Sequence, residues 1–169
     1  MNSLVMGVTF EPYEKDLEMN MINIIDNASG ILSREQSDAI ILACLASTGR
    51  KDLVEIAKRY VISTHGEKVA HASLGASSLM SMTNIYYSAR MNLKSLATTK
   101  PKLKMTFMKQ HGVNETDFEL YALAVSAVNH CKPCMAGHEK VLLDHGVSHD
   151  VVNESIRIAS VINSFAHKL

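Results

Sequence analysis

The chain has 169 residues, 47% of them hydrophobic, which is enough for one buried core and predicts a single domain over residues 1–169. Its 17 basic and 17 acidic residues give zero formal charge with no long uninterrupted run of one sign, which argues against nucleic acid or anionic lipid as a partner. Only 5% of residues are aromatic and none is Trp, which favours helix packing over sheets, so we expect an all-α protein.

Helix start signals divide the chain into a series of helices. Pro12 suits the first turn of a helix, and Ser33 with Gln36 has the spacing of a capping box. Thr116 with Glu119 has the same spacing and predicts a second capping box. Apolar residues at helical spacing follow each signal. The predicted helices span roughly residues 12–27, 33–48, 52–64, 68–91, 101–111, 116–129 and 133–146, with a last helix from Ser148 onward.

A weak internal repeat is visible when the chain is shifted by 83 positions. That shift lays residues 33–36 over residues 116–119, so the two capping boxes coincide. In this register Thr48, Lys51 and Glu55 fall where Cys131, Cys134 and His138 stand in the second half. The first copy would then lack the reactive side chains and serve as scaffold.

The N-terminal residues and the number of cysteines indicate in which cellular compartment the protein works. Residues 1–10 have no basic region followed by a long apolar run, and no apolar stretch approaches the roughly 18 residues of a membrane span. We therefore expect a soluble, cytoplasmic protein with no membrane partner. In that compartment a close pair of cysteines is more often catalytic or metal-binding than structural. Cys44, which lies among Ile41, Leu42 and Leu45, is expected to be a buried small hydrophobe.

The close pair lies in the stretch from Cys131 to His138. Pro133 predicts that a helix starts here, which puts Cys131 at its beginning and Cys134 in its first turn. At this separation a disulfide closes with little backbone movement. Cys134 and His138 are four residues apart and share a face of the helix.

These positions predict separate roles for the side chains. A thiol reacts as its thiolate, which the helix N-terminus, the imidazole and Lys132 all favour at Cys134. Cys134 is therefore the predicted nucleophile, and a sulfenic acid formed on it would condense with Cys131. His138 needs a carboxylate to fix its tautomer, and Glu119 on the preceding helix is the candidate.

The segment from Glu119 through Cys131 and Cys134 to His138 resembles the active-site segment of the AhpD-like alkyl hydroperoxide reductases, a family of peroxidases in the carboxymuconolactone decarboxylase superfamily. The resemblance includes the glutamate twelve residues before the first cysteine. One departure is Pro133, which stands where the family pattern has a histidine between the cysteines. This puts in question any proton step through that position. Further resemblance lies in residues 12–16 and 74–87.

The resemblance implies a homotrimer of all-helical subunits in which Glu119, Cys131, Cys134 and His138 form the catalytic set. It implies reduction of alkyl hydroperoxides, of a partner two-cysteine peroxiredoxin, or of both. Electrons would come from a dihydrolipoyl group on a 2-oxo acid dehydrogenase component, with no tightly bound cofactor. Whether His130, just before the pair, takes over from the missing histidine is left open by the sequence.

Two other functions remain open at this point. Cys131, Cys134 and His138, with Glu119 or water as the fourth ligand, could hold a structural zinc in a helical protein-binding module. However, no second pair of Cys or His residues is present to complete the usual zinc-site pattern. The second alternative is ring-lactone decarboxylation, as in other members of the superfamily, although that reaction needs no dithiol.

Overall fold

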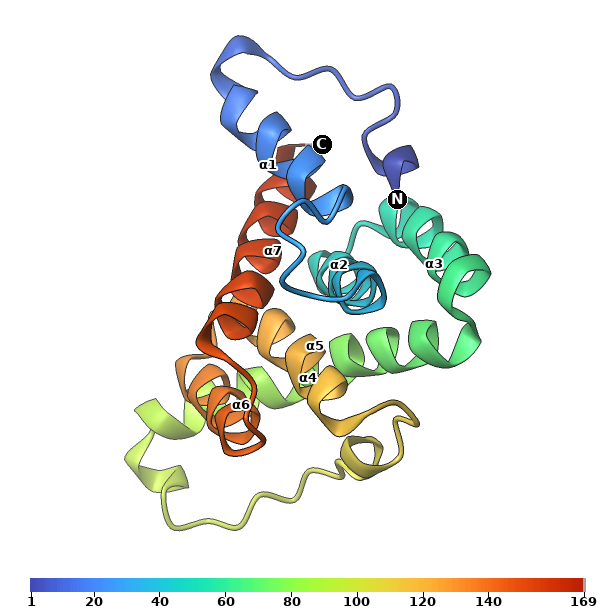
Figure 1. Cartoon of the computed structure of the whole chain (residues 1–169). Coiled ribbons are helices and arrows are strands. Elements are labelled where there is room, and N and C mark those ends of the chain that lie inside the picture. Colours follow the sequence, from blue (N-terminus) through green and yellow to red (C-terminus); the bar gives the residue numbers. More distant parts are fainter. Residues whose placement is uncertain (169) are drawn as a thin grey trace.

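The computed structural model describes residues 1–168, which form seven α-helices and four short 3₁₀ turns, with no β-strand among these residues (Figure 1). The all-α prediction is therefore confirmed. None of these helices is long and apolar enough to cross a lipid bilayer. The helices are α1 (Lys15–Ile25), α2 (Arg34–Thr48), α3 (Lys51–His65), α4 (Glu67–Asn92), α5 (Glu115–Val128), α6 (Lys132–Asp144) and α7 (His149–Lys168), and the 3₁₀ turns are η1 (Asn2–Leu4), η2 (Pro12–Glu14), η3 (Lys94–Leu96) and η4 (Thr106–Lys109).

Helix α2 lies at the centre of the fold, where Figure 1 shows it end-on among the other helices. It packs against α3, α4, α5 and α7, and every residue from Ser37 to Leu45 is buried. A helix surrounded in this way is apolar all round rather than amphipathic. Its start is fixed by the predicted capping box, in which Ser33 Oγ accepts from the Gln36 amide at 3.1 Å and Gln36 Oε1 accepts from the Ser33 amide at 2.9 Å.

The capping box predicted at Thr116 is wrong. Helix α5 begins at Glu115, and its N-cap is Asn114, whose Oδ1 accepts from the Thr116 amide at 2.9 Å. Asn is as good an N-cap as Thr, and it captures the helix start two residues earlier. Glu119 is therefore not a capping residue. It is a buried residue in the second turn of α5.

The helix predicted over residues 101–111 is also wrong. The chain after Pro101 is irregular to Met105 and forms only the turn η4. Instead, the segment is anchored by Phe107, whose ring packs edge-on against His71 of α4 and Phe118 of α5.

The structure supports an internal repeat, but in a different register from the one that the sequence indicated. A shift of 81 residues, not 83, carries Arg34 onto Glu115 and Lys51 onto Lys132, so that the starts of α2 and α3 fall on those of α5 and α6. The 83-residue register aligned the two boxes because it took Thr116 for the N-cap of α5. In the corrected register the counterparts of Cys131, Cys134 and His138 are Arg50, Leu53 and Ala57.

The corrected register pairs two buried carboxylates, Asp38 in α2 and Glu119 in α5. Oδ2 of Asp38 lies 2.9 Å from Nε2 of His65 and accepts from Arg34 Nε at 3.0 Å. A carboxylate and an imidazole thus meet in both halves of the chain, whereas cysteines accompany them only in the second half.

Gly75, in the middle of α4, provides a notch for the ring of Phe107. A Cβ at this position would lie 2.0 Å from Cε1 of Phe107, far inside contact distance. The glycine costs helix stability, because glycine has a low helix propensity. In return, the absence of a side chain at Gly75 lets Phe107 bring the segment that contains η4 close to α4.

Replacing Gly75 by Ala should therefore displace Phe107 and destabilise the protein by about 1–3 kcal/mol, as overpacking does. Gly137 in α6 is the matched control, since a Cβ there meets nothing within 4 Å. Gly137→Ala should raise stability by roughly 0.5–1 kcal/mol through helix propensity. Thermal denaturation of both variants checks this, and equal behaviour of the two would contradict the notch.

Candidate active site

The site is built at the junction between α5 and α6. Helix α5 ends at Val128, and His130 adopts the left-handed conformation with φ of 55°, which reverses the chain within three residues. The amide of Cys131 then donates to the carbonyl of Ser126 at 3.0 Å. Cys131 is the N-cap residue of α6, and Pro133 stands in its first turn, as the sequence predicted. The junction therefore places the two cysteines at the start of a helix.

Cys131 and Cys134 form a disulfide, with their Cα atoms 5.3 Å apart. Cys131 is completely buried, whereas Cys134 is half-buried and lines a cavity. Of the two sulfurs, the one that a reactant in the cavity meets is therefore that of Cys134. This asymmetry agrees with the roles predicted for the two residues.

The third cysteine, Cys44, takes no part in the site. It is fully buried in the central helix α2, as predicted, and burial raises the pKa of its thiol well above the usual range. A thiol that stays protonated is a poor nucleophile.

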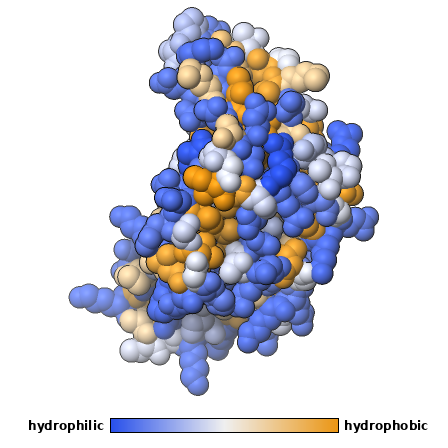
Figure 2. Space-filling view, in the orientation of Figure 1, coloured by the Kyte–Doolittle hydropathy of each residue, from blue (hydrophilic) through white to orange (hydrophobic). Residues whose placement is uncertain are grey.

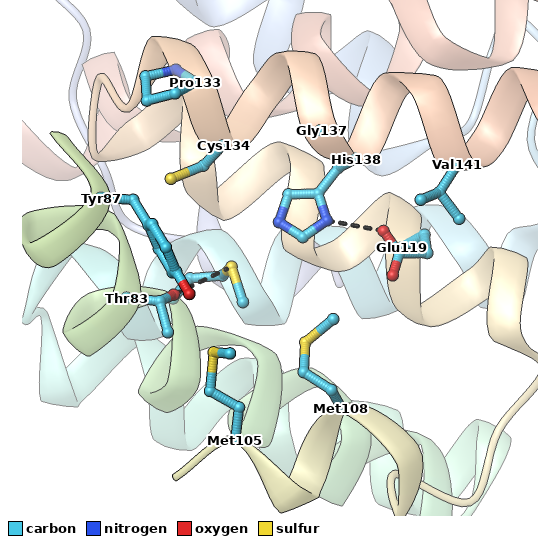
Figure 3. Close-up of a pocket in the computed structure, with 11 residues that line it drawn as sticks. Thr83, Tyr87, Met105, Met108, Glu119, Pro133, Cys134, Gly137, His138 and Val141 are labelled. Atoms are coloured by element: carbon cyan, nitrogen blue, oxygen red, sulfur yellow. Dashed lines mark hydrogen bonds and ion pairs between the residues drawn. The ribbon is translucent and has the colours of Figure 1, made fainter. Parts of the chain in front are cut away.

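Glu119 and His138 meet across the interface between α5 and α6. Oε2 of Glu119 lies 2.6 Å from Nδ1 of His138, and both side chains are largely shielded from solvent (Figure 3). A proton on Nδ1 is donated to the carboxylate, which leaves Nε2 for chemistry. Figure 3 shows this second nitrogen on the side of the ring that faces Cys134. The contact that the sequence predicted between the two residues is thus present.

These side chains open onto a cavity of about 320 Å³. One wall is the reactive one, formed by Cys134, His138 and Glu119. The opposite wall is mostly apolar (Figure 3) and comes from α4 and from the segment around η4. Its residues are Met80, Thr83, Tyr87, Met105 and Met108, while Pro133, Gly137 and Val141 of α6 complete the lining.

Sequence reasoning missed this apolar wall. No motif in the sequence marks these methionines or Tyr87 as residues that line a cavity. A signal was present in α4, because Met80, Thr83 and Tyr87 recur at spacings of three and four and so share one face of the helix. Nothing comparable marks Met105 and Met108, which reach the cavity because Phe107 anchors their irregular segment.

His130 does not take the place of the missing inter-cysteine histidine in this cavity. Its side chain is exposed and borders a separate depression with Ser160 and Asn163 of α7. Among the residues that line the reactive cavity, His138 is the one histidine. Any imidazole chemistry in the cavity therefore depends on His138.

A network of hydrogen-bonded polar side chains supports the junction between α5 and α6. Asn84 of α4 donates through Nδ2 to Ser126 Oγ at 3.0 Å, and its Oδ1 accepts from Asn129 Nδ2 at 2.9 Å. Asn129 Oδ1 in turn accepts from Ser47 Oγ of α2 at 2.9 Å. This network joins α2, α4 and the end of α5 just before the first cysteine, so it fixes the position at which α6 begins.

The zinc alternative finds no ligand cluster in the described part of the chain. Within residues 1–168, no group of three or more His, Cys, Asp or Glu side chains is arranged to hold a metal ion. The sulfurs of Cys131 and Cys134, which zinc would need as separate thiolates, are bonded to each other.

Comparison with known proteins agrees with this geometry. Residues 102–168, which include the whole site except the residues from α4, match the carboxymuconolactone decarboxylase family. This part of the chain is thus all-helical, resembles that family and carries a disulfide at the start of a helix.

Curated relatives extend the match to most of the chain. This chain is 34% identical over 160 residues to alkyl hydroperoxide reductase AhpD of Rhizorhabdus wittichii, and the aligned region covers 91% of this chain and 89% of the relative. It is 34% identical over 169 residues to the AhpD of Koribacter versatilis, covering 98% and 86%, and 33% identical over 158 residues to that of Mycolicibacterium smegmatis, covering 93% and 88%. The chain belongs to the alkyl hydroperoxide reductase AhpD family.

Replacing Asn84 by Ala should destabilise the protein by about 1–3 kcal/mol, because it leaves buried groups of Ser126 and Asn129 without a partner. Asn92→Ala at the end of the same helix is the control, since Asn92 is exposed and should change stability by less than about 0.5 kcal/mol. Urea denaturation of the two variants measures the difference. A loss at Asn84 no larger than at Asn92 would show that this network does not support the junction.

Proposed function

We propose that this protein is a thiol peroxidase that reduces alkyl hydroperoxides through Cys131 and Cys134. The observation that carries the proposal is that the accessible sulfur of Cys134 and the Glu119–His138 pair face one cavity with an apolar opposite wall. The names of the relatives, alkyl hydroperoxide reductase, support the same activity. Reduction of a partner two-cysteine peroxiredoxin is a further role that the pair could serve with the same chemistry.

In the oxidative half of the reaction, the Cys134 thiolate attacks the outer oxygen of the hydroperoxide. An S–O bond forms, the O–O bond breaks, and the leaving alkoxide takes a proton to become the alcohol. His138 is placed to supply that proton, while Glu119 stabilises its charged form. The thiolate of Cys131 then attacks the sulfenic acid on Cys134, and hydroxide leaves as water after protonation. One hydroperoxide and two thiols thus give one alcohol, one water and the disulfide.

In the reductive half, a dithiol donor restores the thiols. One donor thiolate attacks Cys134, because Cys131 is buried, and Cys131 leaves as a thiolate and takes up a proton. The second donor thiol then attacks the mixed disulfide and releases Cys134. Two electrons and two protons pass from the donor to the cysteine pair. We expect a dihydrolipoyl group on a 2-oxo acid dehydrogenase component to be this donor.

The apolar wall favours a hydroperoxide with an organic group. The cavity is lined by the apolar side chains of Met80, Met105, Met108 and Val141. Because they carry no charge and form few hydrogen bonds, burial of an alkyl chain against them lowers the free energy of binding. Lactone decarboxylation is less well supported, because that reaction makes no use of the Cys131–Cys134 disulfide.

The assembly and the compartment stay predictions. The family resemblance implies a homotrimer, which size-exclusion chromatography with light scattering would test. A cytoplasmic location follows from the sequence expectation alone and would be tested by fractionation of cells that produce the protein.

Adding an alkyl hydroperoxide to the reduced protein should form the Cys131–Cys134 disulfide, and Cys134→Ser should lower peroxide consumption to the background rate. Cys131→Ser is the matched control. It keeps the nucleophile and should consume about one equivalent of peroxide, leaving a sulfenic acid that a dimedone probe traps. Mass spectrometry distinguishes these products. An active Cys134→Ser variant would rule out the assignment of the nucleophile.

Glu119→Gln should slow peroxide reduction by roughly 10²-fold without unfolding the protein, because an amide does not balance the charge of a protonated imidazole. The pH dependence of the rate should change as well, since proton transfer by His138 is affected. Glu139→Gln, next to His138 but exposed, should leave both unchanged. The role of Glu119 is contradicted if its variant keeps the pH–rate profile of the wild type.

A further inference from the structure

The zero net charge of the chain hides a strong separation of charge. Between Glu67 and Glu115 there is no acidic residue, while seven Lys or Arg residues fall in the same stretch. One of the seven is Lys68 near the start of α4, and the other six lie in residues 90–109. The rest of the chain carries all 17 acidic residues and is correspondingly negative.

The cationic residues lie on the segment that borders the reactive cavity. Lys94, Lys100, Lys102, Lys104 and Lys109 are all exposed. The same segment contains Met105 and Met108 of the cavity wall. Figure 1 shows the segment as the connection from α4 to α5 along the lower edge of the molecule, and Figure 2 shows that edge as mostly hydrophilic.

A second cavity of about 340 Å³ lies next to the reactive one under this segment. It is lined by Tyr87, Arg90, Met91, Ala97 and Pro133, and it shares Tyr87 and Pro133 with the reactive cavity. The guanidinium of Arg90 donates to the carbonyls of Ala97 and Thr99, at 2.8 and 2.6 Å, and so holds the segment against the end of α4.

Exposed apolar side chains accompany these cations. Met91 and Leu93 are 71% and 51% exposed, and Ile85 on α4 is 75% exposed. Exposed apolar side chains combined with charged ones are typical of protein interfaces. Long-range attraction by the cations would raise the rate at which a partner of opposite charge arrives.

We propose that residues 85–109 form the docking surface for an acidic protein that carries the reducing dithiol on a flexible arm. This inference rests on the proposed function. The buried position of Cys131 requires the reductant to enter through the cavity and attack Cys134. A folded donor is too large to enter, so it docks outside and sends the dithiol past Tyr87 and Pro133.

A protein partner fits this surface better than nucleic acid or an anionic membrane. Neither of those supplies a dithiol, and a surface at the mouth of a redox cavity is useful only to a molecule that exchanges electrons or substrate there. The first turn of α6 adds the exposed Lys132 next to Pro133, which lines both cavities, whereas the exposed acids of α6, Glu139 and Asp144, lie in the second half of the helix.

The test compares two donors on the full-length protein, with reduction of the Cys131–Cys134 disulfide as the measured step. One donor is dihydrolipoamide, which is small and neutral, and the other is a purified dihydrolipoyl domain of acidic isoelectric point. In the triple variant Lys94→Gln, Lys100→Gln, Lys102→Gln, kcat/KM with the domain should fall about tenfold at low ionic strength. With dihydrolipoamide it should not change, and added salt should close the gap.

The matched control removes three cations from α3, on the other side of the fold in Figure 1, as Lys51→Gln, Lys58→Gln, Arg59→Gln. It should behave as the wild type with both donors. Equal loss with both donors, no loss with the domain, or an equal loss in the control variant would overturn the docking surface. So would a wild type that dihydrolipoamide reduces and the domain does not.

Failure of the proposed function has a different signature. A wild-type protein that forms no disulfide with an alkyl hydroperoxide would refute the peroxidase. The docking surface would then still be decided by whether reduction of the existing disulfide by the domain depends on the three lysines. Binding of phosphatidylserine vesicles or duplex DNA that needs these lysines, with unchanged donor kinetics, would overturn it in favour of that other partner.

Discussion

The three-residue turn between α5 and α6 is the constraint on which the site depends. It forces Cys131 to end one hydrogen-bonded segment, through the carbonyl of Ser126, and to begin the next. Because the turn is this short, α6 folds back along α5, and Glu119 and His138 meet although 19 residues separate them in the chain. The chemistry of the site therefore follows from the geometry of one chain reversal.

The backbone conformation of this turn costs free energy, and hydrogen bonds from distant parts of the chain stabilise it. A residue with a side chain in the left-handed conformation costs free energy, and His130 has that conformation. The hydrogen bonds that Asn84 and Ser47 direct to the junction come from α4 and α2. The first half of the chain, which lacks the reactive pair of cysteines, thus supports the second half. In the first half the corresponding left-handed position is Gly49, which has no such cost.

Local signals predicted much of this arrangement. The capping box at Ser33, the helix start at Pro133 and the disulfide depend on residues close in sequence, and all three are present. The pairing of Glu119 with His138 was also predictable, since it joins neighbouring helices. The failures have longer-range causes. Residues 101–111 are not helical because Phe107 packs into the notch at Gly75, and the repeat register was misjudged because Asn114 outcompetes Thr116 as a cap. The apolar wall combines residues of α4 with residues of the segment around η4, so no single stretch of sequence indicated it.

The irregular segment between α4 and α5 has a consequence for how such a protein can diversify. Two of the methionines that shape the cavity, Met105 and Met108, lie on an irregular connection that Phe107, His111 and Arg90 hold against the helices. The reactive sulfur and its acid–base pair stand on rigid helices instead. Substitutions, insertions or deletions in the connection can reshape the chamber and its rim without moving a reactive atom. Substrate range and partner choice are thereby free to change in evolution, or by design, independently of the chemistry.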